Sequence, residues 1–508
     1  MFFALPQRPW AHPLKRCRTL WAVAALALLA GAAGANPSPR AAKPRWPAAV
    51  DKALAQAQVP ASAVALLVVD VSGQRAPRLS HRASEAMNPA STIKLVTTYA
   101  ALDALGPDFR WQTRVIMDGR INDGLLEGNM VVRGGGDPKL VVERLQALIG
   151  HVHSSGVRAI KGDIVLDRSA FSDAKADAAA FDGEPLRPYN TQPDALLINF
   201  KSLVMTFTPD PALGRALVRA EPPLAGVQVD ASVPLLRGAR CADWRGDLRA
   251  SIDNPTQVKF AGTYASGCGE LVWPSAYAEP ASYAARAIEG SWRQLGGALT
   301  GRVREATSAE LAMLRSRGTL SGKTAPLRLD SPSLPLLDIV RDVNQFSNNV
   351  MAQHLFLSLG LFGQLAATPA GTLEAGREAL QAWWRKTLPA ATAPVMDNGS
   401  GLSRIERISA NSLAALLQHA AQSPLASTLA ESLPVVGADG RLRERAPGAA
   451  GRAQIKTGSL RDVSAVAGYA DGKSGKRYVV IGMINHPNAS AARPALDRLI
   501  EWTVLDRP

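Results

Sequence analysis

The sequence predicts an α+β fold with a large, mostly β segment inserted into its middle. Three observations indicate this. An apolar run rich in β-branched residues at 64–71 is followed by a helical pattern that begins at Ser91. Residues 108–310 then consist mainly of short strand-like pieces with frequent Gly and Pro. A helical pattern returns at residue 331, and strands and a last helix close the chain.

The first elements follow from hydrophobic periodicity. Residues 64–71 are apolar except for Asp70, which is typical of a buried strand. Residues 78–80 follow a turn and are predicted to form its partner strand. Beyond Ser91, an apolar face recurs at Leu95, Tyr99 and Leu102, with the spacing i, i+4, i+7. This spacing predicts a helix with one core face.

The middle and the end of the chain also contain both predicted strands and predicted helices. Strands are predicted at 111–118, 125–133 and 163–167, with a helix at 141–151, and short strands continue through 195–310. The later elements are predicted as two helices around a polar joint, three strands and a final helix: 336–343, 350–359, 453–457, 463–470, 478–484 and 496–505. Asp471-Gly472 is a hairpin signal between the last two strands.

Composition excludes several classes of protein. Of the 508 residues, 47% are hydrophobic and 20% are charged, which is ordinary for a globular protein. A disordered polyelectrolyte, a collagen-like fibre and a disulfide-dense miniprotein are therefore excluded. A multi-span membrane protein is also excluded, because only one segment approaches the apolar length of a bilayer span. The length predicts two or three domains.

Residues 1–35 have the pattern of a secretory signal peptide. Basic residues precede an apolar run at 20–30, and Ala33-Gly34-Ala35 forms an A-x-A cleavage site. The run is shorter than the roughly 20 residues of a spanning helix. We therefore expect cleavage and export, with a short membrane anchor as the alternative.

Charge and cysteine content fit an exported protein. The net charge of +14 does not indicate a nucleic-acid partner outside the cytoplasm. It leaves two interpretations open: a peripheral attraction to anionic envelope polymer or membrane surface, or an arginine-rich surface without a binding role. Cys241 and Cys268 remain after cleavage and predict one disulfide in an oxidising compartment, worth about 3 kcal/mol. Two free thiols are the alternative.

Three short motifs occur in a meaningful order. S-x-x-K begins at Ser91, S-x-N begins at Ser347 and K-T-G begins at Lys456. Each motif alone arises by chance in many chains. Their order, their places on the predicted elements and the signal peptide together favour a shared site.

The chemistry of acyl transfer explains these residue types. A serine hydroxyl is a weak nucleophile until a base takes its proton, and residues at i and i+3 share a helix face, so Lys94 can reach Ser91. Lysine acts as a base when burial and a neighbouring cation, here Lys456, lower its pKa. Ser347 can relay a proton to a leaving amine. Asn349 can orient Lys94 and the substrate amide.

The K-T-G strand supplies substrate-binding groups. Lys456 and Thr457 lie where a strand borders the site, and the ammonium can bind a substrate carboxylate. Gly458 permits close backbone approach. The backbone N–H groups of Ser91 and Ser459 are candidates for an oxyanion hole. Arg404 has two interpretations, contact with a second substrate carboxylate or a structural ion pair.

Longer strings extend the pattern beyond the three motifs. They are RGGGDP at 133–138, PYN at 188–190, PDA at 193–195, QFSNN at 345–349, DNGSGLSR at 397–404 and KTGSL at 456–460. On these residues the chain resembles the class C low-molecular-mass penicillin-binding proteins, the D-alanyl-D-alanine carboxypeptidase/endopeptidase family. The middle residue of S-x-N is Asn348, where many relatives have Asp.

The resemblance implies a periplasmic serine peptidase. Its substrates would be peptidoglycan stem peptides and cross-links, β-lactams would be covalent inhibitors, and no metal or cofactor would be needed. Ser91 would be the acyl-enzyme nucleophile, Lys94 the base, Ser347 and Asn349 the second motif, and Lys456 the carboxylate anchor.

The resemblance also implies the domain organisation. A penicillin-binding/β-lactamase-like transpeptidase domain, an antiparallel sheet flanked by helices, would combine 36–107 and 311–508. The interval from Ser91 to Ser347 is far longer than in β-lactamases, so 108–310 would be inserted β-rich domains.

Two other functions remain as alternatives. One is a β-lactamase or esterase with the same motifs, although no E-x-x-x-N string follows S-x-N as in class A enzymes. The other is a non-catalytic peptidoglycan-binding scaffold. Against it stands the intact set of motif residues, because a degenerate enzyme usually loses at least one.

Overall fold

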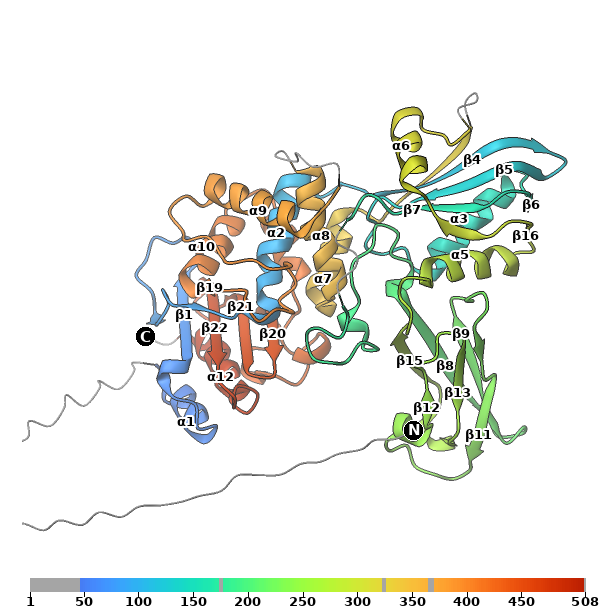
Figure 1. Cartoon of the computed structure of the whole chain (residues 1–508). Helices are drawn as coiled ribbons and strands as arrows, with labels where there is room; N and C mark the ends of the chain where they lie inside the picture. The colour runs from blue at the N-terminus through green and yellow to red at the C-terminus, as the bar shows by residue number, and fades with distance from the viewer. Residues whose placement is uncertain (1–45, 173–176, 322–325, 364–369, 507–508) are drawn as a thin grey trace, which may run out of the picture. The chain divides into compact units, whose positions relative to one another are not determined.

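Strands from both ends of the chain form one antiparallel sheet in the order β2-β1-β22-β21-β20 (Figure 1). Its strands are β1 (Val64–Asp70), β2 (Leu79–His81), β20 (Ala453–Leu460), β21 (Val463–Asp471) and β22 (Arg477–Asn485). The structure, a computed structural model, describes residues 46–172, 177–321, 326–363 and 370–506. The predicted signal peptide lies outside these residues.

Side-chain alternation along the sheet creates two separate cores. In β1, the odd-numbered residues Ala65, Leu67 and Val69 pack into one core, and the even-numbered residues Val64, Leu66 and Val68 pack into the other. Alternation follows from the two-residue period of a strand. Both faces are therefore covered, which explains why the strand is apolar from Val64 to Val69.

Helices cover both faces of this sheet. One core includes residues of α2 (Lys94–Leu105), α7 (Leu336–Phe346), α8 (Asn349–Phe362), α9 (Leu373–Thr387), α10 (Ala410–Ala421) and α11 (Ala426–Ser432). The other includes residues of α1 (Ala48–Gln56) and α12 (Arg493–Leu505). The predicted helix-flanked antiparallel sheet is confirmed. A short bridge between β3 (Ala86–Met87) and β19 (Ile408–Ser409) lies beside it.

Helix α2 is buried on all sides through its first turns. The sequence predicts one core face, but every residue from Lys94 to Leu102 is buried. Its polar side chains find partners inside: Thr97 Oγ1 donates to Gly399 O at 2.7 Å, and Thr98 Oγ1 donates to Lys94 O at 2.7 Å. The turn that carries Ser91 therefore leads into a helix whose first residues are all buried.

The inserted segment contains mixed sheets over a common core. One sheet has the order β16-β6-β5-β4-β18, with β7 and β17 beside it, and another has the order β14-β11-β9-β8-β15. The strands of the first are β4 (Gln112–Asn122), β5 (Leu125–Arg133), β6 (Ala159–Ile160), β7 (Ile164–Asp167), β16 (Ala298–Leu299), β17 (Val303–Glu305) and β18 (Leu327–Pro332). Those of the second are β8 (Ser202–Asp210), β9 (Arg215–Glu221), β11 (Ser232–Leu236), β14 (Tyr264–Ala265) and β15 (Leu271–Ala276).

Smaller elements complete the insertion. A short sheet has the order β10-β13-β12, and helices accompany the strands. These elements are β10 (Gln228–Val229), β12 (Ala250–Ser251), β13 (Gln257–Phe260), α3 (Val142–Ser154) and α4 (Trp244–Asp247). A disulfide joins Cys241 and Cys268 within this part of the chain.

Two helices lie where the sequence predicted only short strands or a boundary. Helix α5 (Tyr283–Gln294) buries Ala284, Ile288 and Trp292, which are spaced by four residues. This is a helical period, so the strand prediction for that stretch was wrong. Helix α6 (Ser308–Arg317) begins with a capping box formed by Thr307 and Glu310.

The inserted sheet also extends past the boundary predicted at residue 310. Strand β18 pairs with β4 along its whole length, from Leu327 opposite Met117 to Pro332 opposite Gln112. All residues of β18 are exposed or half-buried, so no apolar run marks it. An edge strand of this kind leaves no hydrophobic signal in the sequence. In the described part of the chain, no helix has the length and apolar character that a membrane span requires.

Candidate active site

Ser91 and Lys94 lie together at the start of the buried helix. Ser91 belongs to the 3-10 turn Ala90–Ile93, which runs directly into α2, whose first residue is Lys94. Lys94 Nζ lies 3.0 Å from Ser91 Oγ. Ser91 is half-buried and Lys94 is completely buried. The hydroxyl is thus open to a substrate while the amine is shielded from water.

Two carbonyl groups complete the surroundings of the Lys94 amine. Its Nζ donates to Asn349 Oδ1 at 2.8 Å and to the backbone carbonyl of Ser400. A neutral amine has two N–H bonds and one lone pair. Because both carbonyls accept N–H groups, the lone pair of the neutral amine is left facing Ser91 Oγ.

Burial shifts Lys94 toward this neutral form. Desolvation lowers the pKa of Lys94 well below its ordinary value, and the charge of Lys456 lowers it further. The charge of Glu406 acts in the opposite direction and raises the pKa of Lys94. The site therefore carries the electrostatic conditions that a lysine base requires.

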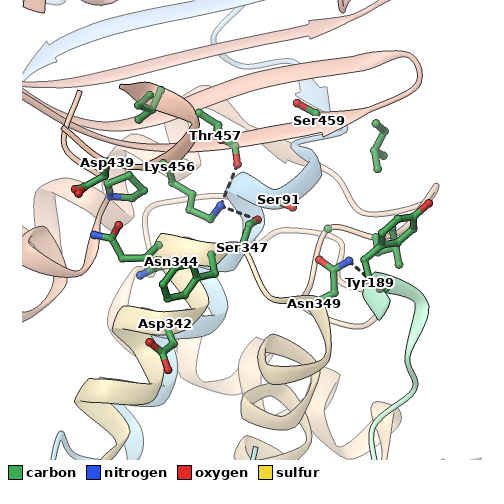
Figure 2. Close-up of a pocket in the computed structure, with 18 of the residues that line it drawn as sticks. Ser91, Tyr189, Asp342, Asn344, Ser347, Asn349, Asp439, Lys456, Thr457 and Ser459 are labelled. Carbon is green, nitrogen blue, oxygen red and sulfur yellow. Dashed lines mark hydrogen bonds between the residues drawn. The ribbon is translucent and has the colours of Figure 1, made fainter. Parts of the chain in front are cut away.

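The S-x-N motif forms the joint between two helices. Helix α7 ends at Phe346, and Ser347 adopts a left-handed conformation with φ of 56°. Asn348 then caps α8, since its side chain accepts a hydrogen bond from Met351 N at 3.1 Å. Asp would accept the same bond, so Asn at this position keeps the cap. The joint directs Ser347 and Asn349 toward the cleft (Figure 2).

The amide of Asn349 is held from both ends. Its Oδ1 accepts from Lys94, and its Nδ2 donates to the backbone carbonyl of Tyr189 at 3.0 Å (Figure 2). Tyr189 belongs to the inserted segment. Two opposite partners fix which end of the amide faces the lysine, so the insertion contributes to the geometry around Lys94.

Strand β20 carries the third motif along the cleft. Lys456 Nζ donates to Ser347 Oγ at 2.8 Å and to Thr457 O at 3.1 Å (Figure 2). A Cβ atom on Gly458 would lie 2.7 Å from Pro89 O and 2.9 Å from Ser91 N. Only glycine allows β20 to approach Ser91 so closely.

A cleft of about 840 Å³ contains these groups. The motif residues that line it are Ser91, Ser347, Asn349, Lys456, Thr457 and Ser459. The inserted segment lines it with Phe181, Asp182 and Tyr189. Asp182 holds that wall together, because its carboxylate accepts from Tyr189 Oη at 2.8 Å and from Asn190 Nδ2 at 2.7 Å.

Arg404 is not among the residues that line the cleft. Its guanidinium forms an ion pair with Asp462 at 2.8 Å, with both side chains about half exposed. The guanidinium also lies over the ring of Phe181, 4.8 Å from its centroid. The structure thus shows the structural ion pair that was one of the two interpretations of this residue.

Sequence reasoning assigned no role to three groups that shape the site: the Tyr189 carbonyl, the Ser400 carbonyl and Glu406. Two of these are backbone atoms, which no residue type reveals. Tyr189 and Ser400 do lie within the strings PYN and DNGSGLSR. Within the described ranges, His, Cys, Asp and Glu form no cluster of three or more that could hold a metal ion.

Comparisons with known proteins agree with this arrangement. The D-Ala-D-Ala carboxypeptidase 3 (S13) family matches residues 47–504. The D-alanyl-D-alanine carboxypeptidase DacB of Haemophilus influenzae is 27% identical over 411 residues, covering 80% of this chain and 82% of the relative. The D-alanyl-D-alanine carboxypeptidase of an Actinomadura species is 28% identical over 445 residues, covering 83% and 77%.

A solved structure shows the same fold. The crystal structure of penicillin binding protein 4 from Haemophilus influenzae aligns with a TM-score of 0.68 at 23% identity, covering 88% of this chain and 97% of that one. The family match spans nearly all of the described residues. The chain therefore belongs to the D-Ala-D-Ala carboxypeptidase 3 (S13) family, the serine D-Ala-D-Ala carboxypeptidases of the class C low-molecular-mass penicillin-binding proteins.

Proposed function

We propose that Ser91 is the nucleophile of this serine carboxypeptidase and DD-endopeptidase and that Lys94 is its base. The observation that carries this proposal is the arrangement of three groups around the Lys94 amine. Two carbonyl oxygens accept its N–H groups, and Ser91 Oγ lies 3.0 Å away on the remaining side. A neutral Lys94 can therefore accept the Ser91 proton as Oγ attacks a peptide carbonyl.

The first half-reaction transfers the acyl group to Ser91. Oγ attacks the carbonyl of the penultimate D-Ala, and its proton passes to Lys94 Nζ. The backbone N–H groups of Ser91 and Ser459 donate hydrogen bonds to the tetrahedral oxyanion. The C–N bond then breaks, and the proton held by Lys94 passes by way of the Ser347 hydroxyl to the leaving amine, so Lys94 is neutral again. Lys456 holds that hydroxyl in place through its contact with Ser347 Oγ.

Water completes the cycle in the second half-reaction. A water molecule gives a proton to the neutral Lys94 as its oxygen attacks the ester carbonyl. The bond between the acyl carbon and Ser91 Oγ then breaks, Lys94 returns the proton to Oγ, and the shortened peptide is released. When the leaving group is a terminal D-Ala the reaction is a carboxypeptidase cleavage. When it is the side-chain amine of a neighbouring stem peptide, the same chemistry opens a cross-link.

Lys456 is proposed to bind the carboxylate of the substrate's last residue. It is buried at the wall of the cleft, where an ammonium group is poorly screened by water. Thr457 and Ser459 line the cleft beside it and offer hydroxyl groups to the same end of the substrate.

We propose that the enzyme acts in the periplasm after cleavage of residues 1–35. The support is the signal-peptide pattern of the sequence and the peptidoglycan substrate class, which lies outside the cytoplasm. A peripheral attraction to anionic surfaces rests on the net charge of +14 alone. N-terminal sequencing of the protein from fractionated cells tests the cleavage.

Turnover of defined muropeptides tests the chemistry. A monomeric pentapeptide muropeptide and a cross-linked dimer are incubated with wild-type protein and with Ser91→Ala. Wild-type protein is expected to release D-Ala from the first and to open the second. Turnover by Ser91→Ala at the wild-type rate would refute the proposal.

A further inference from the structure

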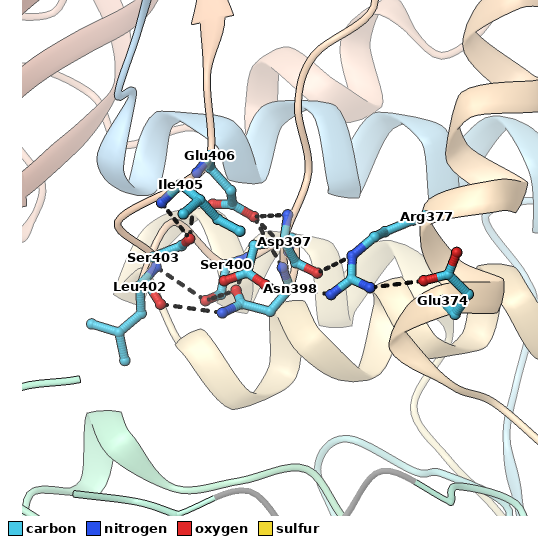
Figure 3. Close-up of polar contacts among 10 residues, drawn as sticks. Glu374, Arg377, Asp397, Asn398, Ser400, Leu402, Ser403, Ile405 and Glu406 are labelled. Atoms are coloured by element: carbon cyan, nitrogen blue, oxygen red, sulfur yellow. Dashed lines mark hydrogen bonds and ion pairs between the residues drawn. The ribbon is translucent and has the colours of Figure 1, made fainter. Parts of the chain in front are cut away.

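Glu406 is a completely buried carboxylate beneath the active site. Its Oε1 accepts backbone N–H groups from Asp397 at 3.3 Å, Asn398 at 3.2 Å and Gly399 at 2.8 Å. Its Oε2 accepts the N–H of Gly401 at 2.9 Å. One side chain thus holds four backbone donors on both sides of Ser400. Figure 3 shows Glu406 beside Asp397 and Asn398, which supply two of them.

The loop held by Glu406 has a conformation that needs such support. Gly399 and Gly401 have φ of 74° and 80°, a region that favours glycine. A Cβ on Gly399 would lie 2.8 Å from the ring of Phe356, and one on Gly401 would collide with the backbone of Ala90. The loop is therefore pressed directly under the turn that carries Ser91.

The central residue of this loop is a partner of the catalytic base. The Ser400 carbonyl accepts a hydrogen bond from Lys94 Nζ. The Ser400 side chain donates to Asn398 Oδ1 at 2.6 Å, within the same loop. The position of that carbonyl is thus set by the loop backbone, and the loop backbone is set by Glu406.

Glu406 is also the acidic group that acts on the charge of Lys94. The charged groups that affect Lys94 are Lys456 and Glu406, and its other contacts are the neutral Ser91, Asn349 and Ser400. Asp397 is the other carboxylate near Glu406, and Arg377 pairs with it at 3.4 Å. Burial raises the pKa of Glu406, and its backbone donors lower it in part.

We propose that Glu406 is a positioning residue for catalysis, which places the Ser400 carbonyl against Lys94 and balances the charge of the buried lysines. The inference rests on the proposed role of Lys94 as the base for Ser91. Loss of the carboxylate would act on two quantities: the geometry of the base and the pH at which the base becomes neutral.

The test is the pH dependence of penicillin acylation. The second-order rate constant for acylation by a fluorescent penicillin is measured across pH for wild type, Glu406→Gln and Glu406→Asp. In the acid limb of the profile, the rate constant rises with pH as Lys94 loses its proton, and it then reaches a plateau. Removal of the Glu406 anion lowers the pKa of Lys94, so the acid limb of Glu406→Gln is expected about one pH unit below that of wild type. Its plateau is expected to fall about tenfold, because an amide N–H would face the Gly401 N–H.

Glu406→Asp separates charge from position. It keeps the anion but is one methylene shorter, so the plateau is expected to fall while the acid limb stays at the wild-type pH. Glu374→Gln is the matched control, because this exposed carboxylate pairs with Arg377 at the outer end of the same network (Figure 3). Its pH profile is expected to match that of wild type.

The outcomes distinguish this inference from the proposed function. An acid limb of Glu406→Gln that coincides with the wild-type limb overturns the inference, whatever happens to the plateau. Absence of a penicillin adduct on Ser91 in the wild-type protein overturns the proposed function instead. Thermal unfolding of each variant shows whether a lowered plateau reflects loss of folded protein.

Discussion

Replacement of Lys456 by methionine is expected to move the pH dependence of acylation upward. Lys456→Met keeps the length of the side chain and removes its charge. Lys94 acts as a base only when it is neutral, so the acid limb of the profile follows its pKa. The charge of Lys456 lowers the pKa of Lys94. Without that charge the pKa rises, and a higher pH is needed for the same fraction of neutral lysine.

The size of the effect follows from burial. Lys94 and Lys456 are 0% and 1% exposed, so water and salt screen their repulsion poorly. Their interaction should exceed that of exposed pairs, which is about 0.2–1 kcal/mol. A value of about 1.4 kcal/mol corresponds to one pH unit, and we expect a shift of about that size.

The assay is again the rate of acylation by a fluorescent penicillin as a function of pH. Lys52→Met, which removes an exposed lysine of α1, is the control and should leave the profile unchanged. A limb that stays in place in Lys456→Met, or that moves to lower pH, would refute the electrostatic reasoning. The shift is opposite in sign to the one expected for Glu406→Gln, so the two variants together test the whole charge balance.

Three further predictions follow from the site and from the disulfide. Ser91→Ala should abolish muropeptide turnover and leave the melting temperature unchanged; a large fall in melting temperature would contradict this. Gly458→Ala should lower kcat/KM at least tenfold, because its Cβ would lie 2.7 Å from Pro89 O and 2.9 Å from Ser91 N; wild-type kinetics would show that β20 can move away. Joint replacement of Cys241 and Cys268 by serine should lower the free energy of unfolding by about 3 kcal/mol, measured by urea titration, with unchanged stability as the contrary result.

The residues of the three motifs could be predicted from the sequence to form one site because each motif is a short local string on a recognisable element. Ser91 and Lys94 share one turn of chain, and Lys456 lies in a segment predicted as a strand. In the structure Ser91, Asn349 and Lys456 line one cleft, and Lys94 contacts Ser91 and Asn349 behind it. The fold class was predictable for the same reason, since buried strands and hairpin signals are local.

The groups that support the base could not be predicted in this way. Glu406 lies in a charged string, Arg404 to Arg407, that is typical of an exposed loop, yet its side chain is fully buried among backbone donors. The carbonyls of Tyr189 and Ser400 act through backbone atoms, which any residue type could supply. Strand β18 was missed because it is an edge strand with no buried residue.

Intact-mass spectrometry after exposure to benzylpenicillin tests the central claim most directly. The mature protein and Ser91→Ala are each incubated with the drug. The intact mass of each is then measured, and the modified peptide is located by proteolysis and peptide mapping. We predict one persistent penicilloyl adduct on the peptide that contains Ser91, absent from the variant. An adduct on another residue, or none while penicillin remains intact, would contradict the assignment of Ser91 as the nucleophile; none with rapid consumption of the drug would indicate a β-lactamase instead.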